Sequence, residues 1–519
     1  MAHDARLEEL LPQVASILEE QGVVAYLAGG FLRDALLGRP SNDVDLAVAG
    51  DPLALARLVA DTLGGHYVLL DEVLPTARVV FPDASADAGI VYFDFCQFRG
   101  EDILADLAQR DFTINALVID LQHALGPLVF GPWSLVAGTT DYGLRTTDHG
   151  PRTILDPFGG LADLRAGLIR AVHDGVFRDD PLRLLRAVRF VAQLGFQIEP
   201  HTQALIRRHS ALAAQPAGER VLEEIVKILS APEAGQHLHL LDSLGLLTVV
   251  IPELNSLRGV SQPQEHYWDV FEHSLQTVSA AERVLNSLHN PHPTLPRITW
   301  EGRVGEKLRA HFAEVLAADR PRTIAFKLAA LLHDIAKPQT RSVEPNGRIR
   351  FINHQIVGLP IVEDILRRLR LSRREIAVIL TVIEHHLRPG QLTDEQSVSK
   401  RAVYRFFRDT GAEGIDVLFL SLADHLATRG PLLNPDHWAQ HVAMTQAMLS
   451  YYLAPEPAAA PVRLITGDDI LALGVPSGPR VGELLDQVHE AQAAGEVRTR
   501  EEALAFACIL LRTPIPDAD

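Results

Sequence analysis

Residues 25–50 read AYLAGGFLRDALLGRPSNDVDLAVAG, and this stretch decides the fold of the first part of the chain. The apolar run 23–27 predicts a buried strand, and a helix is predicted over 31–37. Gly29-Gly30 stands between the two. A diglycine there lets a ligand approach the backbone and leaves N–H groups free at a helix start. The stretch therefore predicts a place for a phosphate group.

A second strand is predicted to begin at Asp43, directly after this helix. Asp43 and Asp45 project to the same face of that strand because side chains alternate along it. Two neighbouring carboxylates repel one another unless a cation lies between them. An isolated Asp-x-Asp is usually solvated turn chemistry, but here it follows a diglycine and a strand. The combination predicts a phosphate cradle that faces a divalent-metal site.

Length and composition place the chain among large globular proteins. Its 519 residues are too many for one core, so three to five domains are expected, and its composition of 47% hydrophobic and 22% charged residues is typical of soluble proteins. No apolar run approaches the ~18 residues of a membrane helix. The N-terminus has no signal-peptide pattern, and Cys96 and Cys508 do not make a disulfide framework. We therefore expect a cytoplasmic protein with no membrane contact.

The charge balance limits how this protein binds phosphates. A net charge of −18 argues against a surface that binds nucleic acid throughout, although it allows a local basic track. The first lysine is Lys227, so the first 226 residues cannot contain a P-loop lysine. Phosphate binding in that half must use arginine, backbone N–H groups and metal.

The coarse reading of the chain is a mixed first part followed by helices. Helices are predicted over 7–21 and 52–63, and strands over 67–70, 77–81 and 90–98. Asp94 lies inside the last of these strands, as either a metal partner or a capped edge residue, and we favour the metal partner. Residues 121–150 have no clear period and are interpreted as an inserted loop or hairpin. The chain is predicted to be helical from Phe177 onward.

A stripe of arginines marks the first long helix of this second part. Asp179-Asp180-Pro181 predicts its start, and it continues to Leu194. Arg183, Arg186 and Arg189 recur at helical spacing, so they share one face. The stripe is either a solvated face or a row of guanidinium forks for phosphates and base edges.

Five motifs in this order resemble one family, the class II tRNA nucleotidyltransferases and the related bacterial poly(A) polymerases. The resemblance covers roughly residues 20–260. Each motif is weak alone, but the set is highly specific. The matching pieces are Gly29-Gly30-x-x-Arg33-Asp34, Asp43-x-Asp45-Leu-x-Val48, Arg110-Asp111-Phe-Thr-Ile-Asn115-Ala116, Asp156-Pro-Phe-Gly159-Gly160 and Asp179-Asp180-Pro-Leu-Arg183-Leu-Leu-Arg186.

The resemblance implies a role for each matched residue. Asp43 and Asp45 would hold catalytic Mg²⁺ ions, and two such ions can activate a 3′-hydroxyl and stabilise leaving pyrophosphate. Gly29, Gly30 and Arg33 would contact the triphosphate of the nucleotide, and Arg110, Asp111 and Asn115 would position its sugar and phosphates. The Watson–Crick edge of CTP or ATP would be read by Asp180 and Arg183. Arg186 and Arg189 would lie near phosphates.

The chain departs from the family pattern at three places. Asp179 stands where the family usually has Glu, and Gln109 where it usually has Arg. The third departure is the segment between Phe98 and Arg110. Members that complete the CCA end, or that add A, usually carry a longer flexible loop there. The short segment resembles the CC-adding subgroup, which stops before the terminal A.

A second set of residues is similar to the HD superfamily of metal-dependent phosphohydrolases. His273, the pair His333-Asp334 and Asp424 match its metal-ligand pattern, which suits a divalent transition metal (Ni, Mn, Fe or Co) on a helical bundle. The equivalents of His354 and His386 are extra ligands in members with a second metal. The domain could hydrolyse a phosphoester such as a 2′,3′-cyclic phosphate, or be a degenerate scaffold.

We therefore expect an α+β multidomain fold: an N-terminal α/β nucleotidyltransferase head with a mixed sheet, then all-α neck, body, HD domain and tail. The expected boundaries are head 1–165, neck and body 166–260, HD domain 261–432 and tail 433–519. The tail resembles the module of HD-containing relatives that is expected to touch the tRNA elbow.

The predicted reaction is template-independent transfer from CTP to the 3′ end of tRNA, giving CC. Complete CCA or A addition with ATP, and poly(A) synthesis on general RNA, are alternatives on the same site. A phosphohydrolase whose head only binds RNA, and an inactive RNA-binding scaffold, are alternatives of another class.

Overall fold

The computed structural model describes residues 5–72, 74–82, 90–124, 154–290, 298–300, 302–393, 398–454 and 463–512. The chain divides into two compact units. The first is Met1–Pro216 with Leu244–Leu246, and the second is Ala217–Ser243 with Leu247–Asp519. The finer division into four parts stays a prediction, and most of the predicted insertion 121–150 lies outside the described residues.

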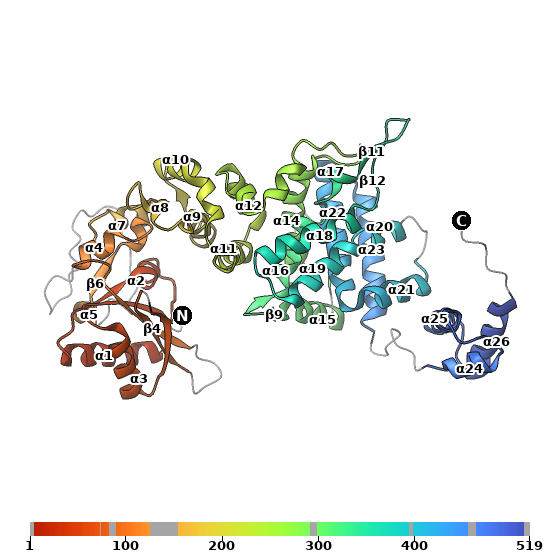
Figure 1. Ribbon diagram of the computed structural model, residues 1–519, viewed down its shortest axis with the longest axis horizontal. Helices are drawn as coiled ribbons and strands as arrows, with labels where there is room; N and C mark the ends of the chain where they lie inside the picture. The colour runs from red at the N-terminus through yellow and green to blue at the C-terminus, as the bar shows by residue number, and fades with distance from the viewer. Residues whose placement is uncertain are drawn as a thin grey trace. The chain divides into compact units, whose positions relative to one another are not determined.

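The first unit is built on a β-sheet (Figure 1). The sheet has six strands in the order β3-β4-β5-β2-β1-β6. Only β2 and β5 run parallel, and the other neighbours are antiparallel, so the sheet is mixed as expected. Its strands are β1 (Ala25–Ala28), β2 (Asp43–Val48), β3 (His66–Asp71), β4 (Thr76–Phe81), β5 (Val91–Gln97) and β6 (Val118–Asp120).

The register of the central strands places charged residues in one row. Asp45 on β2 lies opposite Asp94 on β5, and Asp94 lies opposite Arg78 on β4. Residues directly opposite one another share a face of the sheet. The apolar neighbours Phe93 and Phe95 are fully buried and hold β5 in the core. A buried apolar sheet thus carries a polar row across its middle.

Helices of the first unit pack against this sheet, and α3 (Pro52–Leu63) covers β3, β4 and β5. The side chain of Asp51 caps its start and Gly64 ends it in the left-handed region, which confirms the predicted bounds. The other helical elements are α1 (Ala5–Glu20), α2 (Gly29–Leu36), α4 (Ile103–Ala108), η1 (Thr113–Asn115), α5 (Leu121–Ala124), α7 (Gly160–Ala166), α8 (Val176–Asp179), α9 (Arg183–Leu194), α10 (Pro200–His209) and η2 (Ser210–Ala214), with the parallel pair β7 (Leu168–Ile169) and β8 (Gln197–Ile198).

The predicted start of the arginine helix is wrong by a few residues. The short helix α8 ends at Asp179, and α9 begins at Arg183. Asp180 between them is extended, with φ −144°, and its carboxylate accepts a hydrogen bond from the N–H of Leu182. Asp180 therefore ends one helix and supports a turn, instead of lying in the first turn of the next.

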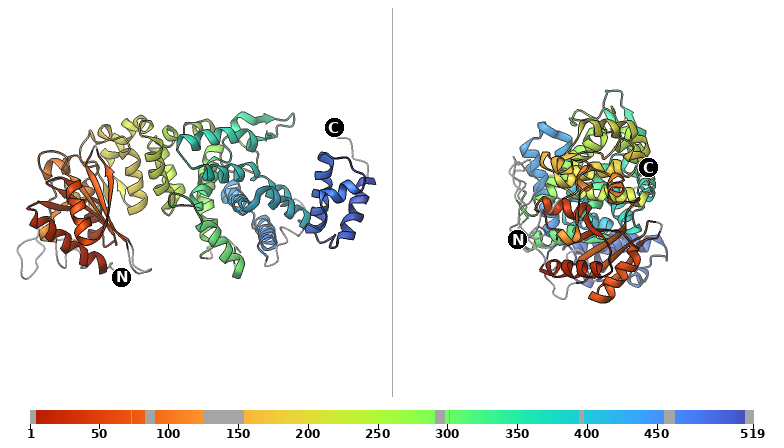
Figure 2. Two further views of the ribbon diagram at one scale, coloured as in Figure 1. Left: turned by 60° about the horizontal axis from the view of Figure 1, so that its bottom comes forward. Right: turned by 90° about the vertical axis from the view of Figure 1, so that its left-hand side faces the viewer.

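The second unit is helical, as Figure 2 shows from two further sides, apart from short hairpins. Its centre is the packing of α14 (Val270–Asn286) against α16 (Arg322–Leu332) and α22 (Gly414–Arg429). The remaining helices are α11 (Gly218–Ser230), α12 (Ala234–Ser243), α13 (Leu247–Val250), η3 (Pro252–Leu257), α15 (Gly302–Ala313), α17 (Lys337–Thr340), α18 (His354–Arg368), α19 (Arg373–His385), α20 (Arg388–Thr393), α21 (Lys400–Thr410), η4 (Gly411–Glu413), η5 (Gly430–Leu432), α23 (Pro435–Tyr452), α24 (Gly467–Ala472), α25 (Pro479–Ala493) and α26 (Arg500–Arg512).

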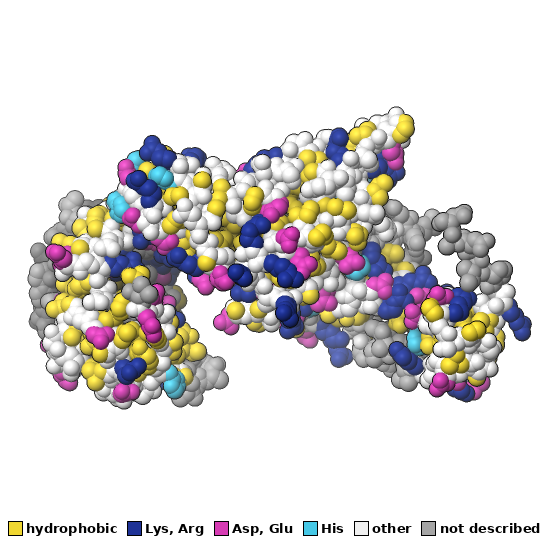
Figure 3. Space-filling view, viewed as in Figure 1, with side chains coloured by type: hydrophobic (Ala, Val, Ile, Leu, Met, Phe, Trp, Pro, Cys, Tyr) yellow, Lys and Arg dark blue, Asp and Glu magenta, His cyan; other side chains and the backbone are white. Residues whose placement is uncertain are grey.

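Within the described residues two hairpins interrupt these helices, and the sequence pattern did not predict them. They are β9 (Val315–Ala317) with β10 (Arg320–Pro321) and β11 (Arg341–Val343) with β12 (Ile349–Phe351). The last three helices, α24 to α26, share a small apolar core that includes Ile470, Leu484 and Ala503. None of the helices in the described ranges is long and apolar enough to cross a membrane. On the visible face of the second unit, basic and acidic side chains are interspersed (Figure 3).

Candidate active sites

Asp45 is held against the diglycine at the start of α2. The backbone N–H of Gly30 donates to Oδ2 of Asp45 at 3.0 Å. A Cβ added at Gly29, where φ is +65°, would lie 2.9 Å from that same oxygen and 3.1 Å from Nη1 of Arg110. Only glycine fits this close approach. The diglycine therefore seats the carboxylate directly, while the sequence predicted it as a phosphate cradle.

The surroundings of Asp45 and Asp43 disfavour the charged form of both carboxylates. Burial, together with the nearby Asp43, raises the pKa of Asp45 to about 6. Burial and Asp94 raise the pKa of Asp43, and Arg78 opposes them. Paired carboxylate oxygens with raised pKa values are suited to a hard divalent cation, so the residues present fit Mg²⁺.

Arg110 is positioned by an acid that sequence reasoning missed. Its Nε and Nη2 donate to Oδ2 of Asp106 at 3.0 and 2.9 Å, and its Nη1 donates to the carbonyl of Asn115 at 3.2 Å. Asp106 is buried in α4, which packs on β1 and β2. The missed signal was the spacing of four residues between this acid and this arginine, which allows the two side chains to meet.

A chain of hydrogen bonds connects three predicted nucleotide-binding residues to α9. Nη1 of Arg33 donates to Asn115 at 2.8 Å, and Nδ2 of Asn115 donates to Asp111 at 2.8 Å. Nε of Arg186 donates to the other oxygen of Asp111, also at 2.8 Å. Burial raises the pKa of Asp111, but Arg186 and Asn115 outweigh it and hold that pKa well below its usual range. Asp111 is therefore a buried carboxylate that stays ionised.

Three arginines gather around one ring that the sequence analysis did not single out. The guanidinium groups of Arg33, Arg186 and Arg189 lie 5.1, 5.5 and 4.4 Å from the ring centre of Phe190. Arg189 is buried and Arg186 is partly exposed, so the arginine stripe is not a solvated face. The three arginines around the ring of Phe190 concentrate positive charge beside α2, the helix that begins with the diglycine.

Arg183 lies at the C-terminal end of α4. Its Nη2 donates to the carbonyl of Gln109 at 2.7 Å, and burial lowers its pKa. Asp180, three residues before it, interacts with it electrostatically. The structure thus brings the predicted base-reading pair to the same end of α4 as Arg110.

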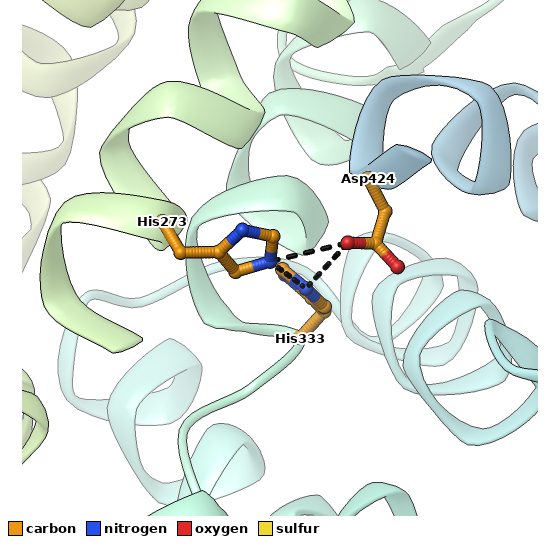
Figure 4. Close-up of side chains that lie close together, drawn as sticks. All are labelled: His273, His333 and Asp424. Carbon is orange, nitrogen blue, oxygen red and sulfur yellow. Dashed lines mark hydrogen bonds and ion pairs between the residues drawn. The ribbon is translucent and has the colours of Figure 1, made fainter. Parts of the chain in front are cut away.

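A second cluster of metal-ligating side chains lies inside the second unit. Atoms of His273, His333 and Asp424 come together from α14, the end of α16 and α22 (Figure 4). Nε2 of His273 lies 3.3 Å from Nε2 of His333 and 3.1 Å from Oδ1 of Asp424. Both histidines are buried. The predicted ligands from distant parts of the chain therefore meet at one point.

His354 and His386 join this cluster through Asp334. His333, Asp334 and His386 form a second group of converging ligand atoms, and Nε2 of His354 lies 3.1 Å from Oδ1 of Asp334. The Nδ1 atoms of His354 and His386 lie 2.7 and 2.6 Å from backbone carbonyls, to which they donate. Both rings therefore turn Nε2 into the cluster, where the two Nε2 atoms lie 3.3 Å apart. Imidazole nitrogens that converge beside the carboxylate of Asp334 suit a bound divalent cation.

The chain is similar to known proteins over most of its length. Family models match at residues 25–131 (Poly A polymerase head domain), 195–257 (Probable RNA and SrmB- binding site of polymerase A) and 270–429 (HD domain). The chain is 33% identical to the A-adding tRNA nucleotidyltransferase of Deinococcus radiodurans over 93% of its own length and 94% of that relative. The chain belongs to the tRNA nucleotidyltransferase family. It is therefore a nucleotidyltransferase of tRNA processing, and the resemblance found in its motifs is confirmed.

Other relatives in the family carry different specificities. The CC-adding tRNA nucleotidyltransferase of Geobacter sulfurreducens is 32% identical, with 97% of this chain and 96% of that relative covered. Among solved structures, the Thermotoga maritima CCA-adding enzyme complexed with tRNA aligns with a TM-score of 0.59 at 21% identity, covering 98% and 99% of the two chains. A CCA-adding enzyme with CTP aligns at 0.63 and 22%, covering 99% of each. These structures share the fold, and divalent metals are typical of both the nucleotidyltransferase and the HD families.

Proposed function

We propose that this tRNA nucleotidyltransferase adds C from CTP to the 3′ end of tRNA and stops after CC. The observation that carries the proposal is the short, closed connection between β5 and α4, which occupies only residues 98–102. Members of the family that add A usually have a longer flexible loop at this place.

Hydrogen bonds close this connection from several sides. The N–H of Arg99 donates to Asp106 at 3.1 Å, and Nε2 of Gln109 donates to the carbonyl of Arg99. Asp102 caps α4 by accepting from the N–H of Ala105 at 2.8 Å. The segment is therefore tied to the helix that also holds Arg110. A segment so short and so bonded has no free length with which to rearrange the site for ATP.

The residues around Asp43 and Asp45 support the chemistry. These two carboxylates would hold Mg²⁺, which supplies Lewis-acid activation of the 3′-hydroxyl and charge stabilisation of pyrophosphate. Gly30 orients Asp45 through its N–H, and Arg110 lies beside Asp45 on the same side of Gly29. The arginines around Phe190 would bind the triphosphate. Asp180 and Arg183 would read the edge of cytosine by offering an acceptor and donors.

Addition of A is the second candidate, because the Deinococcus radiodurans relative is an A-adding enzyme. The two candidates separate on three acceptors: tRNA lacking CCA, tRNA ending in C and tRNA ending in CC, each with Mg²⁺ and labelled CTP or ATP singly. We expect CTP to extend the first two acceptors as far as CC. ATP should label none of them. Label from ATP on the CC-ending acceptor would contradict CC addition, and long A tails on an unstructured RNA would favour a poly(A) polymerase.

We also propose that the HD domain hydrolyses a phosphoester with a bound transition metal (Ni, Mn, Fe or Co). A cavity of about 430 Å³ supports this, since Asp424 and His386 line it together with Arg429 and His437. Metal ligands beside an arginine suit a phosphate group. The test is hydrolysis of a nucleoside 2′,3′-cyclic phosphate by protein loaded with each metal in turn. Failure with every metal would favour a degenerate scaffold.

We also propose that the tail helices α24 to α26 bind tRNA. Their similarity to the C-terminal module of HD-containing relatives suggests a contact with the tRNA elbow. Deletion of residues 463–519 should weaken tRNA binding without lowering CTP affinity, as measured by filter binding. Unchanged tRNA affinity would count against this role.

A further inference from the structure

Arg78 connects two of the three carboxylates at the centre of the sheet. It lies on β4 opposite Asp94, and Asp94 lies on β5 opposite Asp45. Asp43, two residues before Asp45, projects to the same face. One cation therefore stands in a row with two acids, and a third acid lies two residues away on the same face. Sequence reasoning passed over it, although it is the only charged residue in the alternating run 76–81.

The guanidinium group of Arg78 occupies both oxygens of Asp94. Nε lies 2.7 Å from Oδ1 of Asp94, and Nη2 lies 2.7 Å from Oδ2. This is the paired geometry in which arginine binds a carboxylate most strongly. Asp94 is mostly buried. The fork directs two N–H groups and a positive charge at Asp94, which disfavours a metal ion on the same carboxylate. The sequence-based preference for Asp94 as a metal partner stays a prediction.

A further contact of Arg78 reaches Asp43. Its Nη2 donates to Oδ1 of Asp43 at 3.1 Å. The side chain of Asp43 is 56% exposed, so few other groups of the sheet restrain it. The guanidinium carbon lies 4.7 Å from the ring centre of Tyr92, the residue opposite Asp43 in the register. Arg78 is thus held by Asp94 and Tyr92 while it restrains one oxygen of Asp43.

We infer that Arg78 is a positioning residue of the transferase site. It excludes Asp94 from metal binding, which leaves Asp43 and Asp45 as the carboxylate ligands, and it orients Asp43 toward the metal. The Arg78–Asp94 pair is neutral as a unit, so the charge offered to the divalent cations comes from Asp43 and Asp45. This inference rests on the proposed metal-binding role of those two residues.

The test combines Mn²⁺ binding, followed by electron paramagnetic resonance, with steady-state transfer of C to tRNA. The variants are Arg78→Met, Asp94→Asn and the double variant, with Arg57→Met as the matched control. The guanidinium carbon of Arg57 lies 4.7 Å from the ring centre of Tyr67, the same distance as between Arg78 and Tyr92. Arg57 is, however, exposed on α3. We expect each single variant to lose about 10–100-fold in kcat, as outer partners of metal ligands do. The double variant should lose no more than either single one, because the two residues act as a unit.

The affinity for Mn²⁺ shows whether Asp94 only holds Arg78 in place or binds the metal itself. We expect Asp94→Asn and Arg78→Met to bind Mn²⁺ with affinities within about twofold of one another, because the two residues act as a unit. A loss of Mn²⁺ affinity in Asp94→Asn that exceeds the loss in Arg78→Met by about tenfold or more would make Asp94 a ligand in its own right and overturn the inference. Arg78→Lys keeps the charge but cannot fork both oxygens of Asp94 and reach Asp43 as well, so its kcat should also fall. Full activity of Arg78→Lys, or of a folded Arg78→Met, would overturn the inference too.

The parent proposal is tested separately by Asp45→Asn. If that variant still transfers C, the metal-binding role of Asp45 fails, whatever Arg78 does. If Asp45→Asn is inactive while Arg78→Met behaves as Arg57→Met does, only the inference about Arg78 fails.

Discussion

Asp111 illustrates how single residues hold the transferase site together. Its buried carboxylate accepts from Arg186 on one oxygen and from Asn115 and the N–H of Phe112 on the other. Truncating one member of a buried charged pair usually costs several kcal/mol because the partner is left without compensation. Asp111 therefore stabilises the head while it aligns Asn115 and Arg186.

Asp111→Asn should lower the free energy of unfolding by about 3 kcal/mol at pH 7. The folded state depresses the pKa of Asp111, so its contribution is complete above the unfolded value of about 3.9 and is lost as the pH falls toward the folded value. The difference between the two proteins in urea denaturation should therefore shrink between pH 7 and pH 3. Asp61→Asn, at an exposed position of α3, is the control. A cost that stays constant or grows on acidification would contradict this account.

At the residue scale, site residues could be predicted where their partners are close in the sequence. Site residues whose partners are distant in the sequence were missed. Asp43 and Asp45 followed from strand alternation. Arg78 acts on Asp94 and Asp43, 16 and 35 residues away, and only the strand register makes these contacts visible. Phe190 was predicted as no more than a helix residue, because nothing local shows that Arg33 would lie against its ring.

At the scale of elements, the motif at 156–160 packs the start of α7 closely against η1. The carboxylate of Asp156 accepts from the N–H groups of Gly160 and Leu161 at the start of α7. A Cβ added at Gly160 would lie 2.2 Å from the carbonyl oxygen of Thr113, in the element that carries Asn115. The close approach of these backbones requires glycine at that position.

Gly160→Ala should therefore destabilise the protein by about 3 kcal/mol, since neither backbone can move without opening the core. Gly159→Ala is the matched control: its φ is +77°, but an added Cβ meets nothing within 4 Å. It should cost about 1 kcal/mol, the strain of the left-handed region alone. Thermal unfolding followed by circular dichroism measures both. Equal losses would mean that the contact with Thr113 does not matter.

The helices of the HD domain position ligands that are far apart in the chain, and His386→Ala tests this. We expect the purified protein to lose most of its bound transition metal, measured by inductively coupled plasma mass spectrometry. The neighbouring His385→Ala should keep that metal, because His385 is in neither group of converging ligand atoms. Equal metal content in the two variants would remove His386 from the ligand set.

Element bounds were predictable where the pattern was local and strong. The bounds of α3 and the alternating strand β4 follow from capping residues and from period-two alternation. The start of α9 was placed too early because Pro181 suits both a first helical turn and the turn that the structure contains. The hairpin of β11 and β12 has exposed or half-buried strands, so no hydrophobic alternation marks it.

At the scale of the whole molecule, the transferase residues and the HD residues belong to different compact units. We therefore expect the two chemistries to be separable. Asp45→Asn should abolish C addition and leave phosphoester hydrolysis unchanged, and His333→Ala should do the reverse. Steady-state rates of both reactions in both variants measure this. Loss of both reactions in a folded His333→Ala protein would mean that the sites are coupled.

The most direct test of the central claim is the mass of the product. A tRNA transcript that lacks its CCA end is incubated with Mg²⁺, CTP and ATP together, and intact mass spectrometry counts the nucleotides gained. The proposal predicts a gain of two cytidylates and nothing further, and no gain with Asp45→Asn. A product that carries the terminal A, or a gain with Asp45→Asn, would contradict it.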